Sequence, residues 1–250
     1  PEITFNEIGF RDGVNVTVGN GFVKIGSCTI VLKNTEIWLP SSISSNPATR
    51  LNELRSNLDA IFSMVNFHPV PPGLGLLTKM ADQTNCKTLP FPLPPLAGLL
   101  FPFIQQLAKG ILSADLNLIE SGTRGLVGTG PGLTPSGDDF LGAFFTTIRA
   151  MGPSVYQTTF LEKTCSLIRQ VIVGKTSMIS ESLLQCALEG ASSESIHDLI
   201  SLSLEKSPSK KQDPLSPAVK KVTGSGHSSG WDSLAGIAWG LKTSEAKIRC

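Results

Sequence analysis

The chain has 250 residues, of which 21 are basic and 20 acidic, so its formal net charge at pH 7 is only +1. Without a long-range field, neither nucleic acid nor an anionic membrane surface is expected as a partner. The five cysteines include no Cys-x-x-Cys pair, which argues against a zinc ribbon and against a disulfide framework.

The N-terminal residues predict short strands separated by turn-forming Arg-Asp-Gly, Gly-Asn-Gly and Lys-Asn-Thr. Because the turns are short, the strands should form a small antiparallel sheet or barrel. The expected strands are Phe5–Phe10, Val14–Val18, Phe22–Ile25, Thr29–Leu32 and Glu36–Leu39.

The rest of the chain predicts helices. From Pro47 to Asn66 the apolar side chains recur every three to four residues, which is the period of one helical face. Further helices are expected at 97–109, 135–150, 155–172, 176–189, 194–204 and 231–242, with an exposed loop at 205–215. The predicted fold class is therefore α+β: a β-rich N-terminal part (1–45) packed on a larger, mostly helical part (46–250).

The stretch from Leu89 to Ile104 is apolar and uncharged. It contains five prolines, which would leave unpaired backbone groups in lipid, so we do not expect a membrane span. No signal peptide is visible, and the expected location is cytoplasmic.

The segment with most chemical content is Gly128-Thr-Gly-Pro-Gly-Leu-Thr-Pro-Ser-Gly-Asp-Asp139, followed by an apolar helix. Glycines let backbone N–H groups approach a ligand, and a helix start attracts anions. The sequence predicts an anion-binding loop whose substrate-binding residues are Arg124, Gly130, Gly132, Thr134, Ser136 and Gly137.

The paired carboxylates at the end of this loop make it unlike a simple phosphate cradle. Asp138 and Asp139 would repel a phosphate unless a cation intervenes, so each is a candidate catalytic residue that orients an amide or acts as a base. The loop lacks the Gly-Lys-Ser/Thr of the phosphate-binding loop of NTPases, and it is not a Gly-x-Gly-x-x-Gly dinucleotide fingerprint.

A second loop repeats part of this design. Ser229-Gly230-x-Asp232-x-Leu234 has the spacing of Ser136-Gly137-x-Asp139-x-Leu141. We expect the two helix starts to converge on one ligand. The loop adds two candidate catalytic residues, His227 and Asp232, and three candidate substrate-binding residues, Gly226, Ser228 and Ser229.

A third patch, Gly174-Lys-Thr-Ser-Met-Ile-Ser180, opens another predicted helix. Lys175 and Thr176 are candidate substrate-binding residues, Lys175 because its ammonium can meet a carboxylate or phosphate. A solvated lysine and a helix-capping threonine are the alternative interpretation. No resident metal or cofactor is expected, with Mg²⁺ held by the paired aspartates as the alternative.

Three motifs together resemble a known family. Gly-x-Gly-Pro-Gly-Leu-Thr-Pro-Ser-Gly-Asp-Asp-Phe-Leu-x-Gly (128–142), Thr-Ser-x-Ile-Ser-x-x-Leu-Leu-x-x-Ala (176–187) and Gly-His-Ser-Ser-Gly-x-Asp-x-Leu-Ala-Gly (226–236) are similar to those of the H-type subunit family of oxamate carbamoyltransferase. The resemblance covers about the last half of the chain and is loose in the N-terminal strands.

The resemblance implies a role in purine (allantoin) degradation, where oxamate and carbamoyl phosphate are formed from oxalurate and phosphate. It also implies other protein subunits as partners, with a homo-oligomer as an alternative. The leading prediction is a carbamoyltransferase-like enzyme or enzyme subunit acting on a small anionic amide or carboxylate. Two alternatives stay open: a different small-carboxylate or amide enzyme, dependent on ATP and Mg²⁺, and a non-catalytic assembly subunit.

Overall fold

The computed structural model describes residues 13–40, 46–66, 69–83, 92–206 and 213–250. The chain divides into two compact units, Pro1–Leu39 and Pro40–Cys250. The first contains a small sheet and the second is mostly helical, so the predicted α+β class is confirmed. The predicted packing of one part on the other, and its boundary at residue 45, stay predictions.

The sheet has three antiparallel strands in the order β1-β2-β3: Val16–Gly19, Phe22–Ile25 and Cys28–Val31. Its register follows from two-residue hairpins, the first with Gly21 at φ +81° and the second with Gly26 at φ +56°. Asn-Gly and Gly-Ser suit such turns because the glycine adopts positive φ without strain.

Two expected strands are absent from this described sheet. Phe5–Phe10 lies outside the described residues. The strand expected at Glu36–Leu39 is wrong, because pairing ends with β3 and these residues have no strand conformation. Thr35 explains the break: its N–H (3.3 Å) and its hydroxyl (2.9 Å) both donate to the carbonyl of Leu32, so the chain turns immediately after β3.

The helical unit confirms all the expected helices and adds α3 and α8, which the sequence did not predict. Two 3-10 segments also occur, η1 at the start of the first helix and η2 between α1 and α2, where the sequence predicted no helix. The elements are η1 Pro47–Arg50, α1 Leu51–Asn66, η2 Gly75–Gln83, α2 Pro95–Ser113, α3 Leu116–Leu126, α4 Ser136–Met151, α5 Thr158–Ile172, α6 Met178–Leu188, α7 Glu194–Leu202, α8 Leu215–Thr223 and α9 Ser229–Arg249.

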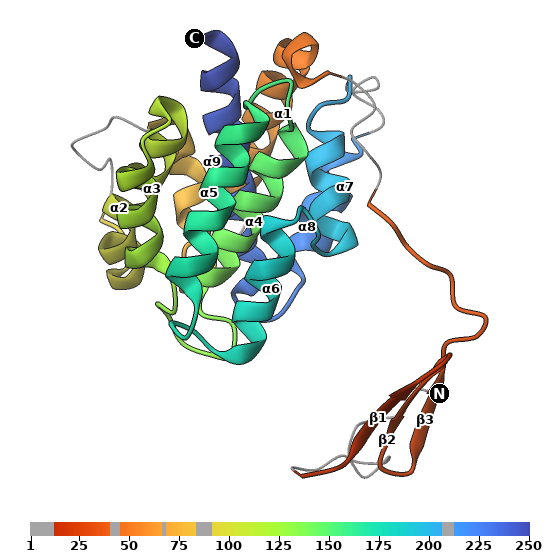
Figure 1. Cartoon of the computed structure of the whole chain (residues 1–250). Helices are drawn as coiled ribbons and strands as arrows, with labels where there is room; N and C mark the ends of the chain where they lie inside the picture. Colours follow the sequence, from red (N-terminus) through yellow and green to blue (C-terminus); the bar gives the residue numbers. More distant parts are fainter. Residues whose placement is uncertain (1–12, 41–45, 67–68, 84–91, 207–212) are drawn as a thin grey trace. The chain divides into compact units, whose positions relative to one another are not determined.

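The centre of this unit is the pair of helices α4 and α9, which Figure 1 shows between α2 and α3 on one side and α7 and α8 on the other. They approach closely because glycines line the seam. A Cβ on Gly236 would overlap the carbonyl oxygen of Phe140, and a Cβ on Gly240 would lie 2.7 Å from the side-chain Cβ of Thr147. Gly236 lies against Phe140, and Gly240, one turn later, lies against Thr147, so the two helices run parallel and begin at the same end.

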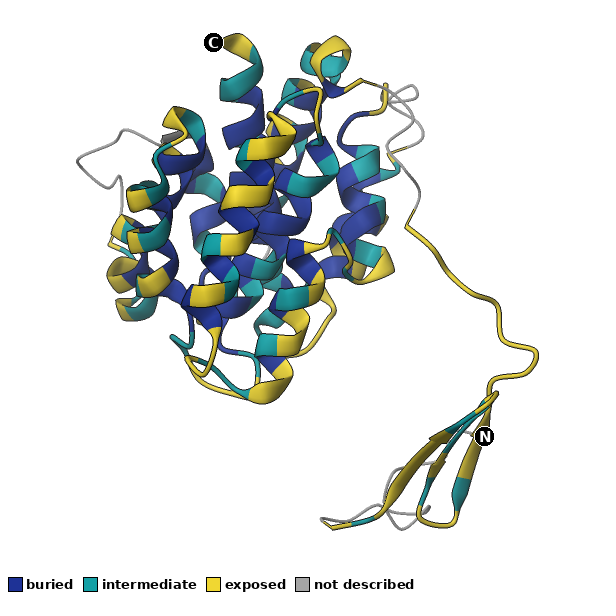
Figure 2. Ribbon diagram, in the orientation of Figure 1, coloured by how far each residue is buried: buried dark blue, intermediate teal, exposed yellow. Residues whose placement is uncertain are grey.

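The surrounding helices bury their apolar faces on this pair, and Figure 2 shows the buried residues in the middle with exposed ones on the outward faces. Trp239 of α9 is fully buried, packs edge-to-face on Phe101 at 6.1 Å and donates its indole N–H to the carbonyl of Leu77 at 2.8 Å. A buried indole needs such a partner for its N–H. This bond holds η2 against α9.

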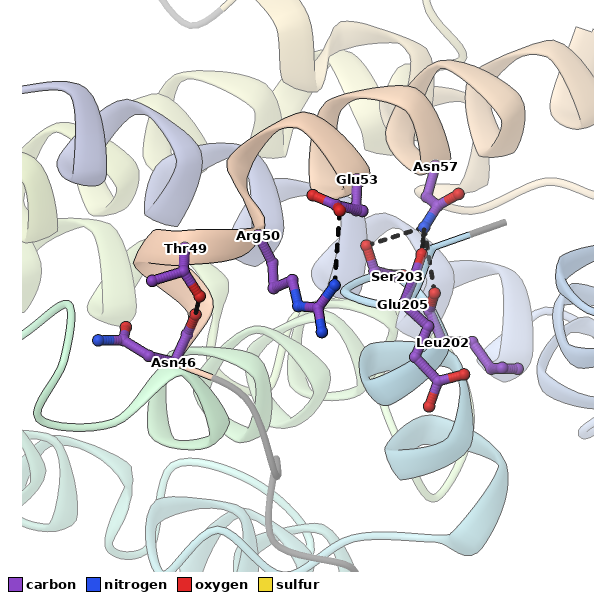
Figure 3. A network of polar contacts seen from close by, with 8 residues as sticks. All are labelled: Asn46, Thr49, Arg50, Glu53, Asn57, Leu202, Ser203 and Glu205. Carbon is purple, nitrogen blue, oxygen red and sulfur yellow. Dashed lines mark hydrogen bonds and ion pairs between the residues drawn. The ribbon is translucent and has the colours of Figure 1, made fainter. Parts of the chain in front are cut away.

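A polar contact joins α1 to the end of α7. The side-chain amide of Asn57, buried, donates to the carbonyls of Leu202 (3.2 Å), Ser203 (3.1 Å) and Glu205 (2.9 Å), as Figure 3 shows. Carbonyls at the end of a helix lack partners within the helix, so Asn57 supplies one from a neighbouring element.

Helix α2 is the one described helix that is long and apolar enough to cross a membrane by length and composition. Its apolar face, including Leu100, Ile104 and Leu107, is buried in the core of the helical unit. That pattern is typical of a core helix.

Candidate functional site

The two Ser-Gly-x-Asp units begin α4 and α9 in the same way. The N–H of Gly137 donates to the carbonyl of Thr129, and the N–H of Gly230 donates to the carbonyl of Ser225, each at 2.9 Å. Each preceding loop is therefore folded back onto the first turn of its helix. The spacing seen in the sequence corresponds to a shared backbone arrangement.

Both glycines are required by the helix that comes before. A Cβ on Gly137 would overlap the carbonyl oxygen of Leu126 at the end of α3, and a Cβ on Gly230 would overlap that of Val222 in α8. An added methyl group has no room in either place. The pairs α3–α4 and α8–α9 are thus two copies of one helix–loop–helix arrangement.

The likeness extends further into the loops than the sequence analysis found. Gly128-Thr129-Gly130 occupies the place of Gly224-Ser225-Gly226, because Thr129 and Ser225 accept the corresponding bonds. Six positions separate Gly130 from Ser136 but three separate Gly226 from Ser229, so the first loop is three residues longer. This difference in length hides the repeat from a fixed-spacing comparison.

The two helix starts meet, as predicted. The hydroxyl of Thr134, in the first loop, lies 3.3 Å from the hydroxyl of Ser229, at the start of α9. Asp139 and Ser229 line the same cavity. The predicted meeting of the two units is therefore confirmed, and binding of one ligand by both stays a prediction.

Asp138 is a buried carboxylate whose oxygens are both occupied. One accepts the N–H of Gly128 at 2.7 Å, and the other accepts the hydroxyls of Ser180, at 2.7 Å, and of Thr176. These bonds tie the first loop to the start of α6. The structure therefore shows Asp138 and Thr176 bound to each other, as parts of the framework of the site.

Asp139 has a different environment, because it lies half-buried in the wall of the cavity and one carboxylate oxygen has no hydrogen-bond partner. Burial raises the pKa of this carboxyl from 3.8 to about 7; the hydroxyls of Ser229 and Thr134 oppose the rise, and the negative charge of Asp232 adds to it. A group with this pKa can both accept and donate a proton near neutral pH.

Asp232, the counterpart of Asp139 in the second unit, is completely buried. One oxygen accepts the N–H of Leu74 at 2.5 Å, and the other has no partner. Burial raises the pKa of Asp232, while the Leu74 N–H and the nearby hydroxyls of Ser136 and Ser228 lower it. Each Asp therefore lies near the serine that begins the other unit: Asp139 near Ser229, and Asp232 near Ser136.

The cavity has a volume of about 450 Å³ and lies between α4, α6, the segment 191–193 with the start of α7, the end of α8 and the start of α9. Leu183, Leu184 and Ile196 give it apolar walls, and several serines line it, including Ser180 and Ser233. The described residues that line it include no Lys, Arg or His. Among these described residues, the ionisable acidic groups are the carboxyls of Asp138 and Asp139.

Three predicted residues with cationic or imidazole side chains lie outside the lining of the cavity. Arg124 is exposed on α3 and forms an ion pair with Glu120 at 2.7 Å. Lys175 is exposed, and its carbonyl lies against Gly128, where a Cβ would overlap it. His227 is exposed in the second loop. Their roles in substrate binding or catalysis stay predictions.

The remaining predicted residues shape the loops. Gly130 (φ +126°) has no room for a side chain, because a Cβ would lie 2.6 Å from the nitrogen of Ser136. Gly132 (φ +94°) has open space around it, and Gly226 adopts φ +64°. The carbonyl of Ser228 accepts two N–H groups from the first turn of α9, those of Trp231 and Asp232, at 2.9 Å each.

Part of the site was not predicted from the sequence. Ser180 binds Asp138 and lines the cavity, and its position one turn after Thr176 on a predicted helix was a usable signal. Ser192, Ser193 and Ser195, around the start of α7, also line the cavity, but a polar segment before a helix carries no signal that it faces a cavity. Within the described residues, no group of three or more His, Cys, Asp or Glu side chains could hold a metal ion.

A family comparison bears on this segment of the chain. Residues 126–241 match the family model of oxamate carbamoyltransferase subunit AllH. The match confirms the resemblance drawn from the three motifs, and it includes both Ser-Gly-x-Asp units and all the residues that line the cavity. No curated protein and no solved structure matched the chain.

Proposed function

We propose that this chain is a subunit of a carbamoyltransferase acting on a small amide such as oxamate, and that Asp139 is its proton-transferring group. Two observations support the proposal. The family that matches residues 126–241 is named for a subunit of oxamate carbamoyltransferase. Within that segment, Asp139 combines a pKa of about 7, an unpaired oxygen and a place in the cavity wall. The second observation carries the catalytic part of the proposal.

The reaction needs a proton donor. When a phosphate oxygen attacks the ureido carbonyl carbon of oxalurate, the bond from that carbon to the oxamate nitrogen breaks, and the departing nitrogen takes up a proton. Protonated Asp139 donates that proton; in the reverse direction its carboxylate removes the proton from the attacking amide nitrogen. An ordinary carboxyl, with a pKa near 4, would be almost fully ionised at neutral pH and a poor donor.

The neighbouring groups orient this carboxyl. Ser229 and Thr134, whose hydroxyls are 3.3 Å apart, bring the two helix starts together beside it. Asp138, fixed by Gly128 and Ser180, holds the first loop and α6 in position. We assign Asp138 a positioning role and Asp139 the catalytic one, which separates the functions of the two adjacent carboxylates.

The test is turnover of oxalurate with phosphate by the chain, alone and together with the proteins encoded by adjacent genes. Asp139→Asn keeps the size of the side chain but cannot transfer the proton, so kcat should fall roughly 100- to 10,000-fold. Asp59→Asn, an exposed substitution on α1, is the matched control and should leave kcat unchanged. Unchanged turnover of Asp139→Asn would remove the catalytic assignment.

The non-catalytic alternative has support of its own, since the matched family is named as a subunit. In that case another chain carries the active site, and the Asp139→Asn substitution leaves turnover of the assembled enzyme unaffected. The same assay therefore separates the two roles.

A further inference from the structure

Exposed apolar side chains gather at the start of α6. Leu133, Met178, Ile179 and Leu183 are 70%, 83%, 53% and 55% exposed. They form one surface because the hydroxyl of Ser177 donates to the carbonyl of Leu133 at 2.5 Å, which holds the tip of the first loop against the first turn of α6. We call these four side chains the α6 patch.

The α6 patch continues into the cavity. Ile179, Leu183 and Cys186 are spaced by four and three residues, so they follow one face of the helix. Leu183 and the exposed Cys186 line the cavity, and Ile179 lies one turn before them. The patch is therefore at the rim of the cavity, and a protein bound there would partly cover its mouth.

The charge of the cavity lining does not complement the anionic substrates that the proposed function requires. Its lining residues carry two carboxylates, and no Lys, Arg or His is among those that the structure describes. Phosphate, carbamoyl phosphate and oxamate are anions, and a buried anion needs a paired cation or several aligned N–H donors. The N–H groups of Gly137, Asp138 and Asp139 already donate to carbonyls of the chain itself.

We infer that the α6 patch is the docking surface for another subunit of the enzyme, and that this subunit places a basic side chain at the mouth of the cavity. The partner has a stated chemistry: an apolar face complementary to the patch, with a Lys or Arg beside it. The charge part of this inference rests on the proposed function. The docking part rests on the exposed patch and on the subunit family that residues 126–241 match.

Two natural cysteines make the docking part testable without engineering. Cys186, at the rim, and Cys250, at the chain end, are both exposed. Helix α9 starts beside the cavity and ends at Arg249, so its 21 residues put Cys250 about 30 Å from that end. Figure 1 shows the C-terminus at the opposite end of the helical unit from α6.

The experiment measures maleimide labelling at each cysteine by peptide mass spectrometry, for the chain alone and for its complex with a co-expressed protein from an adjacent gene. With the partner at about ten times its Kd, labelling of Cys186 should slow about tenfold while that of Cys250 stays constant. Equal labelling of Cys186 in chain and complex overturns the docking site. So does a mass measurement showing that the patch is covered by a second copy of this chain.

A matched pair of variants tests the surface. Ile179→Glu puts a charge into the α6 patch and should abolish the complex, whereas Leu99→Glu, at a residue 60% exposed on α2, should leave it intact. Circular dichroism of both variants shows that the helices are retained. If Ile179→Glu still forms the complex with unchanged affinity, the patch is not the docking surface.

Inorganic phosphate tests the charge part separately. Isothermal titration should show phosphate binding to the complex at least about tenfold tighter than to the chain alone, the signature of a site completed on assembly. Equal affinity for both overturns the basic side chain contributed by the partner. Protection of Cys186 without phosphate binding by the complex keeps the docking surface and counts against the proposed function.

Discussion

The pKa of Asp139 predicts an unusual dependence of stability on pH, which an Asp139→Asn variant would remove. Folding raises the pKa of this carboxyl from its ordinary 3.8 to about 7, chiefly by burial. Between these values the folded protein binds more protons than the unfolded chain. The stabilisation from this group is therefore complete below about pH 4 and is lost as the pH rises to 7.

The size of the effect follows from the shift. A rise of about three pKa units, at roughly 1.4 kcal/mol per unit, corresponds to about 4 kcal/mol between pH 4 and pH 7. Because Asp139 is only half-buried, water screens part of this energy, and we expect about 2 to 4 kcal/mol. Asn cannot ionise, so the variant should match the natural protein near pH 4 and exceed its stability by this amount above pH 7.

The assay is urea unfolding followed by helical circular dichroism at half-unit steps from pH 4.5 to 8, for both proteins. The difference between their free energies of unfolding should grow steadily up to about pH 7 and then level off. A difference that is constant with pH would refute the raised pKa, and with it the assignment of Asp139 as the acid.

Asp232→Asn provides the companion measurement. The charge of Asp232 contributes to the raised pKa of Asp139, so its removal should lower that pKa. The pH range over which the stability depends on Asp139 should then end at a lower pH. The Asn oxygen can still accept the N–H of Leu74, which limits structural change. If this pH range is unchanged in Asp232→Asn, the two carboxylates do not interact.

Two further substitutions test the framework. Asp138→Ala leaves three hydrogen-bond donors without their shared acceptor and should lower the free energy of unfolding by about 3 kcal/mol. The control is Asp115→Ala, which removes the N-cap of α3 and should cost about 1 kcal/mol. If urea unfolding shows equal losses for the two variants, Asp138 does not have this structural role. Gly137→Ala should destabilise the protein by more than about 2 kcal/mol, because the added Cβ has no room. The control Gly142→Ala, on the same helix, meets only ordinary contacts and should be neutral or stabilise by up to about 1 kcal/mol. Thermal unfolding distinguishes the two variants, and a tolerated Gly137→Ala would contradict the close approach of α3 to α4.

The sequence predicted the site best where its signals are local. Ser136 and Ser229 begin helices in short motifs with equal internal spacing, so their likeness was visible without a structure. That the helices are parallel and adjacent depends on glycines such as Gly236, whose lack of a side chain permits contact with α4. The motif was visible, but this packing was not.

Helix α3 shows why other elements were missed. Gly122 and Gly125 lower its helical propensity and suggest a turn. In the structure a Cβ on Gly122 would lie 2.7 Å from the nitrogen of Leu107, and one on Gly125 would overlap the ring of Phe103. These glycines allow α3 to pack closely on α2. A single sequence cannot distinguish a glycine in such a contact from a glycine in a turn. In α8 the apolar pattern is only nine residues long and is interrupted by Pro217.

The bond from the Leu74 N–H to Asp232 has a practical consequence. Asp232 interacts with Asp139 electrostatically and is itself shielded from solvent, so a change of charge in the cavity alters the acceptor of that N–H. The amide proton of Leu74 is thus a natural reporter. Its NMR chemical shift and its exchange with deuterium should follow the protonation of Asp139 and the arrival of a ligand, in the unmodified protein and without any knowledge of what the ligand is.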